Sequence, residues 1–241
     1  MINILKERIA DSETYRLFKS AGVRRAWLHL WPLIRDHWRT LFFINVEGYI
    51  AEVDLTHFVY SERYRQNIEA QGMEFHHLKQ GESLPDFSYG ITQLEIERRL
   101  AAGHLCYSLK HEGQVVCSLW IGSGRINYSG NSVYLYSDHT AFTLSPYQAW
   151  YYDSICHPQY RGKGLSTGLK NEALFYAKEM GVTSVLATVG LDNIANIKAM
   201  FRTGFRMKEK VLFRRYFLFQ SRKKQILSDS DNAGLKLQYH V

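Results

Sequence analysis

Cysteine is scarce in this sequence of 241 residues, where Cys106, Cys117 and Cys156 lie far apart. Their number is odd and no Cys-x-x-Cys spacing occurs, so we expect neither a disulfide framework nor a zinc site. The adjacent His76 and His77 do not alter this expectation, because neighbouring side chains on a strand point to opposite faces. The cysteine pattern fits a reducing compartment, and we expect a cytoplasmic protein.

Long apolar runs are also missing. The first residues, Met-Ile-Asn-Ile-Leu-Lys-Glu-Arg, contain no apolar core followed by a cleavage site, so no signal peptide is predicted. No apolar stretch approaches the length that spans a membrane, and no transmembrane segment is expected. Internal repeats and low-complexity segments are absent as well. The pattern excludes membrane-spanning and repeat architectures.

The composition is that of a globular protein with a basic bias. Hydrophobic residues make up 46% of the chain, enough to fill a sizeable core, and the net charge is +7. Positive charge suits nucleic acid, an anionic membrane or an anionic small molecule. No nucleic-acid-binding module accompanies the basic residues near the C-terminus, so no nucleic acid partner is expected. These residues are Arg214, Arg215, Arg222, Lys223 and Lys224.

Residues 1–70 are predicted to be an N-terminal extension of unknown role. Tryptophan and leucine recur every three or four residues between Val23 and Trp38, with basic residues between them, which is typical of an amphipathic helix. Peripheral contact with a membrane surface is one interpretation of this helix. Packing against the main domain is the other, and we favour it because such stripes usually face a core. A buried strand is predicted over 40–45.

Residues 71–220 are predicted to form an α+β domain with a mixed, mostly antiparallel sheet flanked by helices. Predicted helices cover 91–102, 166–180 and 194–202, and predicted strands cover 73–78, 105–111, 114–121, 132–136, 140–144, 149–156, 184–189 and 211–219. Glu112-Gly113 between two strand-like runs marks a tight hairpin. The strand–helix–strand unit from 150 to 189 requires a parallel, right-handed crossover. Residues 221–241 are predicted to be a polar, loosely held tail.

One segment has the pattern of an anion-binding turn. It runs Pro158-Gln-Tyr-Arg-Gly-Lys-Gly164-Leu-Ser166, directly after a strand and directly before a helix. Two glycines allow the backbone to approach a ligand closely, and the first helical turn offers unpaired N–H groups. The Walker spacing is absent, and the third glycine of a dinucleotide fingerprint would come one residue late, at Gly168. Glycines that serve only as a turn remain the alternative.

These residues carry a family resemblance. Gln159-x-x-Gly162-x-Gly164, preceded by Pro158, resembles the coenzyme A (CoA) pyrophosphate loop of the GNAT superfamily of acyl-CoA N-acyltransferases. The segment from Asn193 to Phe205, in which an asparagine precedes a short helix that ends in Gly-Phe, resembles a second family block. The resemblance covers roughly residues 71–219, with the two blocks in the expected order. Residues 1–70 match nothing in it.

The resemblance implies a fold and a set of cofactor contacts. The family's fourth and fifth strands splay apart, and a bulge in the fourth strand frees backbone groups for the pantetheine arm of acetyl-CoA or another acyl-CoA. The cofactor-binding residues are then Ile155, Cys156 and His157 along the strand, Arg161, Gly162, Lys163, Gly164, Leu165 and Ser166 in the turn, and Asn193 beside the arm. Capping of the next helix is an equal alternative for Asn193 and Asn196.

Direct attack of an amine on the thioester is the chemistry that the resemblance implies, without an acyl-enzyme. Asp153, in the strand expected to line the cleft, is our candidate general base, and a structural aspartate is the alternative. Nucleophilic Cys156 and basic His157 are weaker alternatives. Many family members carry a tyrosine where this chain has Met200, so no general acid is assigned.

The predicted function is an N-acetyltransferase or related acyltransferase that acts on the amine of a small-molecule or sugar acceptor. A CoA-binding regulatory module without catalysis is the alternative, since Met200 cannot donate a proton. A third interpretation is a basic protein that binds RNA or membranes. The sequence does not identify the acceptor or the acyl length.

Overall fold

This computed structural model describes residues 43–84, 91–123, 125–126, 142–216 and 219–241. The chain divides into two units: one comprises Val46–Leu212 with Lys223–Val241, and the other comprises Met1–Asn45 with Phe213–Arg222. The candidate site described below lies within Val46–Leu212. The predicted amphipathic helix over 23–38 and the predicted strand over 132–136 lie outside the described residues.

A mixed sheet of eight strands forms the fold, in the order β10-β9-β1-β8-β7-β4-β3-β2. Its strands are β1 (Phe43–Asp54), β2 (Met73–His77), β3 (Leu105–His111), β4 (Gln114–Ser123), β7 (Gln148–Cys156), β8 (Ser184–Gly190), β9 (Arg206–Tyr216) and β10 (Phe219–Ile226). The pair β7 and β8 is parallel, while β8 pairs antiparallel with β1 and β4 antiparallel with β7. The predicted α+β class and mostly antiparallel sheet are confirmed. A separate pair joins β5 (Arg125–Ile126) and β6 (Phe142–Thr143).

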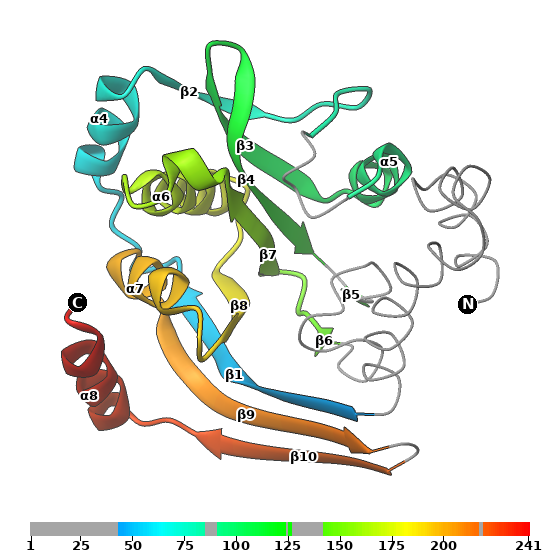
Figure 1. Cartoon of the computed structure of the whole chain (residues 1–241), viewed down its shortest axis with the longest axis vertical. Helices are drawn as coiled ribbons and strands as arrows, with labels where there is room; N and C mark the ends of the chain where they lie inside the picture. The colour runs from blue at the N-terminus through cyan, green and yellow to red at the C-terminus, as the bar shows by residue number, and fades with distance from the viewer. Residues whose placement is uncertain (1–42, 85–90, 124, 127–141, 217–218) are drawn as a thin grey trace, which may run out of the picture. The chain divides into compact units, whose positions relative to one another are not determined.

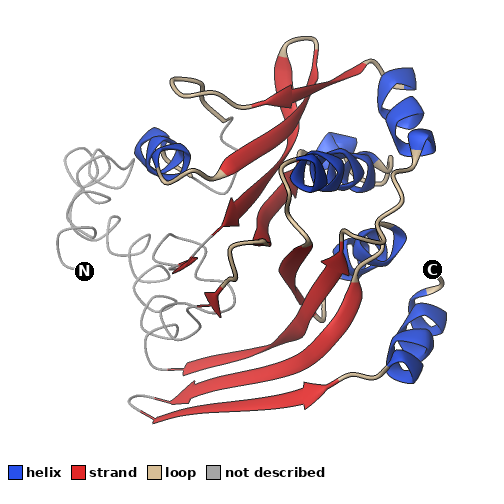
Figure 2. Cartoon of the chain, turned by 180° about the vertical axis from the view of Figure 1, so that it is seen from behind, coloured by secondary structure: helices blue, strands red, loops and turns tan. Residues whose placement is uncertain are grey.

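Among the described residues, five α-helices accompany the sheet, and Figure 1 shows how they are arranged around it. They are α4 (Glu62–Ala70), α5 (Gln93–Ala101), α6 (Leu165–Glu179), α7 (Ile194–Arg202) and α8 (Asp229–Tyr239), and a 3-10 turn, η1, covers Pro158–Tyr160. Figure 2 shows the same elements from behind. The crossover from β7 through α6 to β8 is the unit predicted from the sequence. No helix of the described ranges has the length and apolarity needed to cross a bilayer.

The hairpin between β3 and β4 follows its predicted turn chemistry. Both turn residues have a positive φ, 51° at Glu112 and 77° at Gly113. Two consecutive residues in the left-handed region match the right-handed twist of the flanking strands. The turn therefore fixes the register in which His111 faces Gln114.

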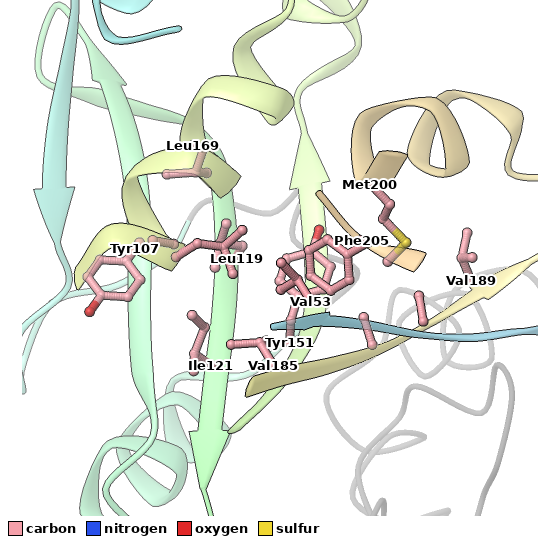
Figure 3. Close-up of a cluster of buried hydrophobic side chains, with 14 of the residues drawn as sticks. Val53, Tyr107, Leu119, Ile121, Tyr151, Leu169, Val185, Val189, Met200 and Phe205 are labelled. Atoms are coloured by element: carbon pink, nitrogen blue, oxygen red, sulfur yellow. The ribbon is translucent and has the colours of Figure 1, made fainter. Parts of the chain in front are cut away.

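Side chains of β7 alternate between two buried clusters. Ala149 and Tyr151 belong to a large cluster with residues of α6 and α7, which Figure 3 shows in close-up. Trp150 and Tyr152 belong to a smaller cluster with Ile96 of α5. This alternation follows from the pleat, because successive strand residues point to opposite faces. The strand that carries the candidate site is therefore held on both sides.

Helix α6 approaches α4 closely at Gly168. A Cβ atom there would lie 2.7 Å from Ile68 Cδ1 and 3.3 Å from the Tyr64 carbonyl oxygen. No side chain larger than a hydrogen fits at this crossing without movement. Glycine thus brings α4 to the N-terminal half of α6, beside the predicted anion-binding turn.

The C-terminal residues differ from their prediction. A single strand over 211–219 and a loosely held tail were expected, but β9 and β10 are separate strands and α8 follows them. Ser228 and Asp231 form a capping box at the start of α8. Asn232 ties this helix to β9, because its side chain accepts a bond from the Met207 N–H and donates one to the Met207 carbonyl.

The strands and helices also bear on the predicted N-terminal extension. Strand β1 pairs with β8 over Gly48–Asp54, and α4 packs beside α6, although both precede residue 71. A domain boundary at residue 71 would place β1 and α4 in a different domain from β8 and α6, the elements that they contact. A division into 1–70, 71–220 and 221–241 stays a prediction.

Candidate functional site

The parallel strands β7 and β8 separate after four paired residues. Pairing runs from Gln148 with Ser184 to Tyr151 with Ala187 and then stops, although β7 continues to Cys156 and β8 to Gly190. Both strands are fully described, so this loss of pairing is a feature of the fold. It leaves one edge of β7 open, as the family resemblance implies for the pantetheine site. Such an edge offers main-chain groups to an extended ligand.

A bulge lies on β7 at the start of the separation. Ser118 pairs with Ile155 and Trp120 pairs with Tyr152, so one β4 residue faces two residues of β7, Asp153 and Ser154. Asp153 has a φ of 46°, in the left-handed region. An extra residue of this kind bends a strand and redirects its side chains. The bulge expected from the resemblance is therefore present, and Asp153 is part of it.

Backbone groups at the end of β7 differ in their availability. Cys156 faces Cys117 with 4.1 Å between the Cα atoms, the spacing of a pair that exchanges no ladder hydrogen bonds. Its N–H therefore points away from β4, toward the open edge. Ile155 is the next residue in the ladder, where alternation directs the backbone groups toward Ser118. His157 is engaged on both sides, donating to the Val116 carbonyl and accepting from the Tyr160 N–H.

Cys117 and Cys156 form a disulfide that the sequence did not predict. They lie 39 residues apart in sequence, yet the pairing of β4 with β7 places them directly opposite each other. The expectation of no disulfide is thus wrong for this pair. Spacing in the sequence does not reveal strand register, which is what brings the two sulfur atoms together. Cys106 is a buried free thiol.

The glycine turn presents unpaired amides. Gly162 and Gly164 have φ values of 76° and 79°, and Gly164 is the N-cap of α6. The first bond of the helix runs from the Gly168 N–H to the Gly164 carbonyl at 3.0 Å. Among the described residues, no backbone N–H from 162 to 167 donates to another main-chain group outside the helix. These amides and the positive end of the helix dipole suit an anion.

Side chains of α4 hold the turn by its outer carbonyl. Asn67 Nδ2 and Gln71 Nε2 each donate to the Lys163 carbonyl oxygen at 3.2 Å. Arg161 Nε donates to the Cys156 carbonyl at 3.1 Å, which closes the turn against β7. The carbonyls of Lys163 and Cys156 are thereby bound, and the amides of the turn remain available. The residues present fit a diphosphate, because Arg161 and Lys163 add positive charge beside the amides.

Asn193 caps the next helix. Its side-chain oxygen accepts a bond from the Asn196 N–H at 3.2 Å. Its own N–H donates to the Gly190 carbonyl at 3.1 Å, just where β8 ends. Capping is therefore one role of Asn193, and contact with a cofactor arm stays a prediction.

Asp153 meets a buried arginine from α5. Arg99 Nη1 donates to Asp153 Oδ2 at 2.8 Å, and Arg99 Nε donates to Glu95 Oε1 at 3.0 Å. The guanidinium also lies 5.1 Å from the ring centres of both Trp120 and Tyr152. Its residue is only 8% exposed, so the ion pair is shielded from solvent. The sequence did not single out Arg99, which reaches the site only because α5 packs on β4 and β7.

One carboxylate oxygen of Asp153 remains open to a partner. Oδ2 is bound by Arg99, whereas Oδ1 accepts no hydrogen bond from any residue that the structure describes. Tyr152, the residue before Asp153, is hydrogen-bonded through its hydroxyl to His104 Nδ1. Burial, followed by the nearby charge of Arg99, lowers the pKa of His104. A polar cluster thus surrounds Asp153 in an otherwise apolar region.

Met200 occupies the place where the resemblance expected a tyrosine. It is fully buried in the same cluster as Tyr151 and Phe205 (Figure 3). A thioether has no proton to donate, and burial of Met200 leaves no room beside it for a solvent donor. Any proton donor must therefore come from another element.

Comparison with known proteins assigns the chain to a family. The model of the "Acetyltransferase (GNAT) family" matches residues 64–205, which is more than half of the sequence. The chain belongs to the GNAT acetyltransferase family, as its loop and helix motifs predicted. This fold supports acyl transfer in general. No curated protein matches the sequence.

Several solved structures are similar to this chain at low sequence identity. A GCN5-related N-acetyltransferase-like protein from Streptococcus suis is 10% identical, with a TM-score of 0.47, and the alignment covers 77% of this chain and 67% of that one. A tandem GNAT protein from the clavulanic acid biosynthesis pathway is 16% identical, with a TM-score of 0.48 and coverages of 86% and 70%.

A third match is a region of a much larger protein. It is the GCN5-related glucosamine N-acetyltransferase region of a fungal multi-domain GH3 β-N-acetylglucosaminidase, 13% identical with a TM-score of 0.47. The alignment covers 80% of this chain but only 22% of that chain. These three likenesses concern the fold.

Proposed function

We propose that this protein is an N-acyltransferase that moves an acyl group from acetyl-CoA or another acyl-CoA to the amine of a small-molecule acceptor, amino sugars included. The observation that carries this proposal is the glycine turn at 162–164, whose amides have no partner in the described chain, while the carbonyls of Lys163 and Gly164 accept hydrogen bonds. Free amides at the start of a helix, with Arg161 and Lys163 beside them, suit an anionic ligand such as a diphosphate.

The turn and the end of β7 are the proposed cofactor contacts. Arg161, Gly162, Lys163, Gly164, Leu165 and Ser166 would hold the diphosphate, and the N–H of Cys156 would meet an amide of the pantetheine arm. Ile155 and His157 stay in the proposed cofactor-binding set as neighbours of Cys156. The backbone groups of Ile155 are directed toward β4, and those of His157 already form hydrogen bonds within the chain. Asn193 would border the arm from the start of α7. When bound, acyl-CoA would supply the activated acyl group.

Asp153 is the proposed acceptor of the proton that the amine must lose. Its free Oδ1 is the group that would meet an ammonium or amine, while Arg99 fixes the other oxygen. Bulge geometry supports this placement, because the φ of 46° turns residue 153 out of the regular alternation of β7. A carboxylate fixed at one oxygen is a defined partner for a small cationic acceptor.

The cellular location is a separate proposal. A cytoplasmic location was predicted from the scarcity of cysteine, and the Cys117–Cys156 pair weakens that argument, since disulfides persist mainly in oxidising compartments. We retain the cytoplasm as the expected location on the condition that both cysteines are found as thiols in the cell.

Calorimetric titration with acetyl-CoA, followed by thiol release across amino sugars, amino acids and aromatic amines, tests the function. Binding together with amine-dependent release of CoA supports the acyltransferase. If acetyl-CoA binds but none of the amines causes release of CoA, the result supports the alternative, a CoA-binding module without catalysis. If the protein binds no acetyl-CoA, whether its Cys117–Cys156 pair is oxidised or reduced, the proposal is overturned.

A further inference from the structure

A lysine is buried on the sheet-facing side of α6. The apolar residues that pack this side are Leu165, Leu169, Ala173, Leu174 and Ala177. Lys170 stands among them with an exposed fraction of 1%. Fully buried lysines are rare, and they usually have an acidic partner. Among the described residues, the only hydrogen bond of Lys170 Nζ is to Ser166 Oγ, at 2.9 Å.

The ammonium group lies where β7 and β8 begin to separate. Lys170 Nζ is 5.3 Å from the centre of the Tyr151 ring, and Tyr151 is the last β7 residue that pairs with β8. On its other side Nζ is bonded to Ser166, in the first turn of the helix that follows the glycine turn. The lysine therefore connects the proposed diphosphate site with the point at which the strands diverge.

Tyr151 adds a second unsatisfied group at this point. Its hydroxyl is buried and has no hydrogen-bond partner of good geometry in the described chain. Ser154 is close enough to lower its pKa in part, but burial dominates and raises the pKa. Buried polar groups without partners are uncommon in native proteins, and they often mark a place where a ligand binds. Lys170 and Tyr151 are thus two polar groups in one cluster that lack a full set of partners.

Within the part of the chain that the structure describes, no acidic group compensates the charge of Lys170. Glu172, on the same helix, is bonded to the Tyr60 hydroxyl, and Asp153, on β7, is bonded to Arg99. Tyr151 is the titratable side chain that faces the ammonium from the sheet. Burial lowers the pKa of Lys170 to about 7, and no charged residue of α4, β4, β7 or α7 contributes to that shift. Near neutral pH the group is therefore ready either to hold or to release a proton.

We propose that Lys170 is the proton donor for the thiolate that departs when the acyl group is transferred. This inference rests on the proposed function. As the amine nitrogen bonds to the acyl carbon, its proton passes to Asp153, which later releases it to solvent. The carbon–sulfur bond breaks, its electron pair stays on sulfur, and sulfur takes a proton from Lys170 Nζ. The neutral lysine then regains a proton from solvent, so that amine and acyl-CoA give amide and free CoA.

Lysine suits this task for a physical reason. A thiol has an ordinary pKa of about 8.5, and a donor whose pKa lies near that value transfers its proton without a large energetic barrier. Met200 cannot supply that proton, although it belongs to the same buried cluster. The lysine on α6 would fill the role that a tyrosine on α7 would otherwise have.

The test compares wild type with Lys170→Met, and with Lys178→Met as the matched control on the exposed side of the same helix. The probe is free CoA, and the readout is the pKa of its bound thiol, followed by the ultraviolet absorbance of the thiolate. A bound thiolate would in turn retain the proton on Lys170, so the two groups titrate as a coupled pair. We therefore expect thiolate to form at lower pH in wild type and in the control than in Lys170→Met. Affinity for CoA should change less than about twofold, because the diphosphate contacts remain.

Two further readouts complete the test. Acyl transfer should fall by a factor of about 100 in Lys170→Met. We also expect wild type to lose activity above pH 7, as Lys170 loses its proton, and this pH dependence should vanish in Lys170→Met. The melting temperature of Lys170→Met should be at least that of wild type, since methionine fills the same volume without a charge. Equal thiol pKa values in wild type and Lys170→Met, or a lower melting temperature for Lys170→Met than for wild type, would overturn the proposed role of Lys170. Neither result would affect the proposed function. If wild type does not bind CoA, both the role of Lys170 and the proposed function are overturned.

Discussion

Arg99 donates a hydrogen bond to Asp153 at 2.8 Å, and the two side chains are 9% and 16% exposed. The pair joins α5 to the bulge of β7, and the two residues are 54 positions apart in the sequence. A solvent-exposed carboxylate would be stabilised by water and would not require an arginine partner. Because this one is largely shielded from water, the guanidinium fixes both the position of Asp153 and its charge balance.

Removal of Arg99 should therefore destabilise the fold. We expect Arg99→Met to lower the free energy of unfolding by about 3 kcal/mol, because Asp153 would be left buried without its partner. Adding Asp153→Asn should restore part of the loss, since asparagine tolerates a positive φ and has no charge. Urea denaturation measures both. Arg98→Met is the control, expected to cost less than about 1 kcal/mol because its ion pair with Glu95 is exposed. Equal losses for Arg98→Met and Arg99→Met would contradict this account.

Gly168 should not tolerate a methyl group. A Cβ atom would meet Ile68 at 2.7 Å, so Gly168→Ala should lower the free energy of unfolding by about 1–3 kcal/mol. Combining it with Ile68→Ala should cost less than the sum of the two single changes, because the second change makes room for the first. Additive losses in a thermal-unfolding cycle would show that the two helices do not meet as described. Gly234→Ala, on α8 with nothing near its Cβ position, is the control.

The two paired cysteines should behave differently from the third. Denatured without reductant under oxidising conditions, the chain should show one free thiol, Cys106, and after reduction it should show three. Because the bridge closes a loop of 39 residues, its loss should lower the free energy of unfolding by about 4 kcal/mol in the chain-entropy description. Mass spectrometry of alkylated protein measures the thiols. Three free thiols without reductant would contradict the Cys117–Cys156 pair.

Stability should depend on pH through Lys170. Its pKa is about 7 in the folded chain, against 10.5 for an ordinary lysine, so between these values the unfolded chain binds more protons. Stability from this group is thus lowest below pH 7 and rises toward pH 10. Lys170→Met should exceed wild type by on the order of 4 kcal/mol at pH 6, and the difference should shrink by pH 10. A difference that does not change with pH in denaturant titrations would contradict a buried, charge-penalised lysine.

Local patterns predicted much of the sheet and its helices. The hairpin at Glu112-Gly113, the helix Ile194–Arg202 and the crossover around α6 follow from turn residues and periodicity, which act over a few residues. Helix α8 was missed although Ser228 and Asp231 carry the spacing of a capping box. The polar composition of that segment concealed it.

Long-range contacts were beyond the reach of the sequence. The partners of Asp153 and Cys156 are Arg99 and Cys117, and each pair depends on register or packing that no local pattern states. Lys170 has the same origin, because a lysine on a helix is exposed by default and only the packing of α6 on β7 buries it. The glycine turn could be predicted because the strand, the two glycines and the helix follow one another directly in the sequence.

The central claim is that the turn after Pro158 binds acyl-CoA through its amides, and calorimetry on two glycine variants tests it most directly. Gly162 and Gly181 both have a positive φ, 76° and 83°, and open space at the Cβ position, so Gly162→Val and Gly181→Val should carry a similar backbone cost of about 1–2 kcal/mol. We predict that Gly162→Val weakens acetyl-CoA binding at least tenfold and that Gly181→Val binds as wild type does. Equal affinity in all three proteins would contradict the claim.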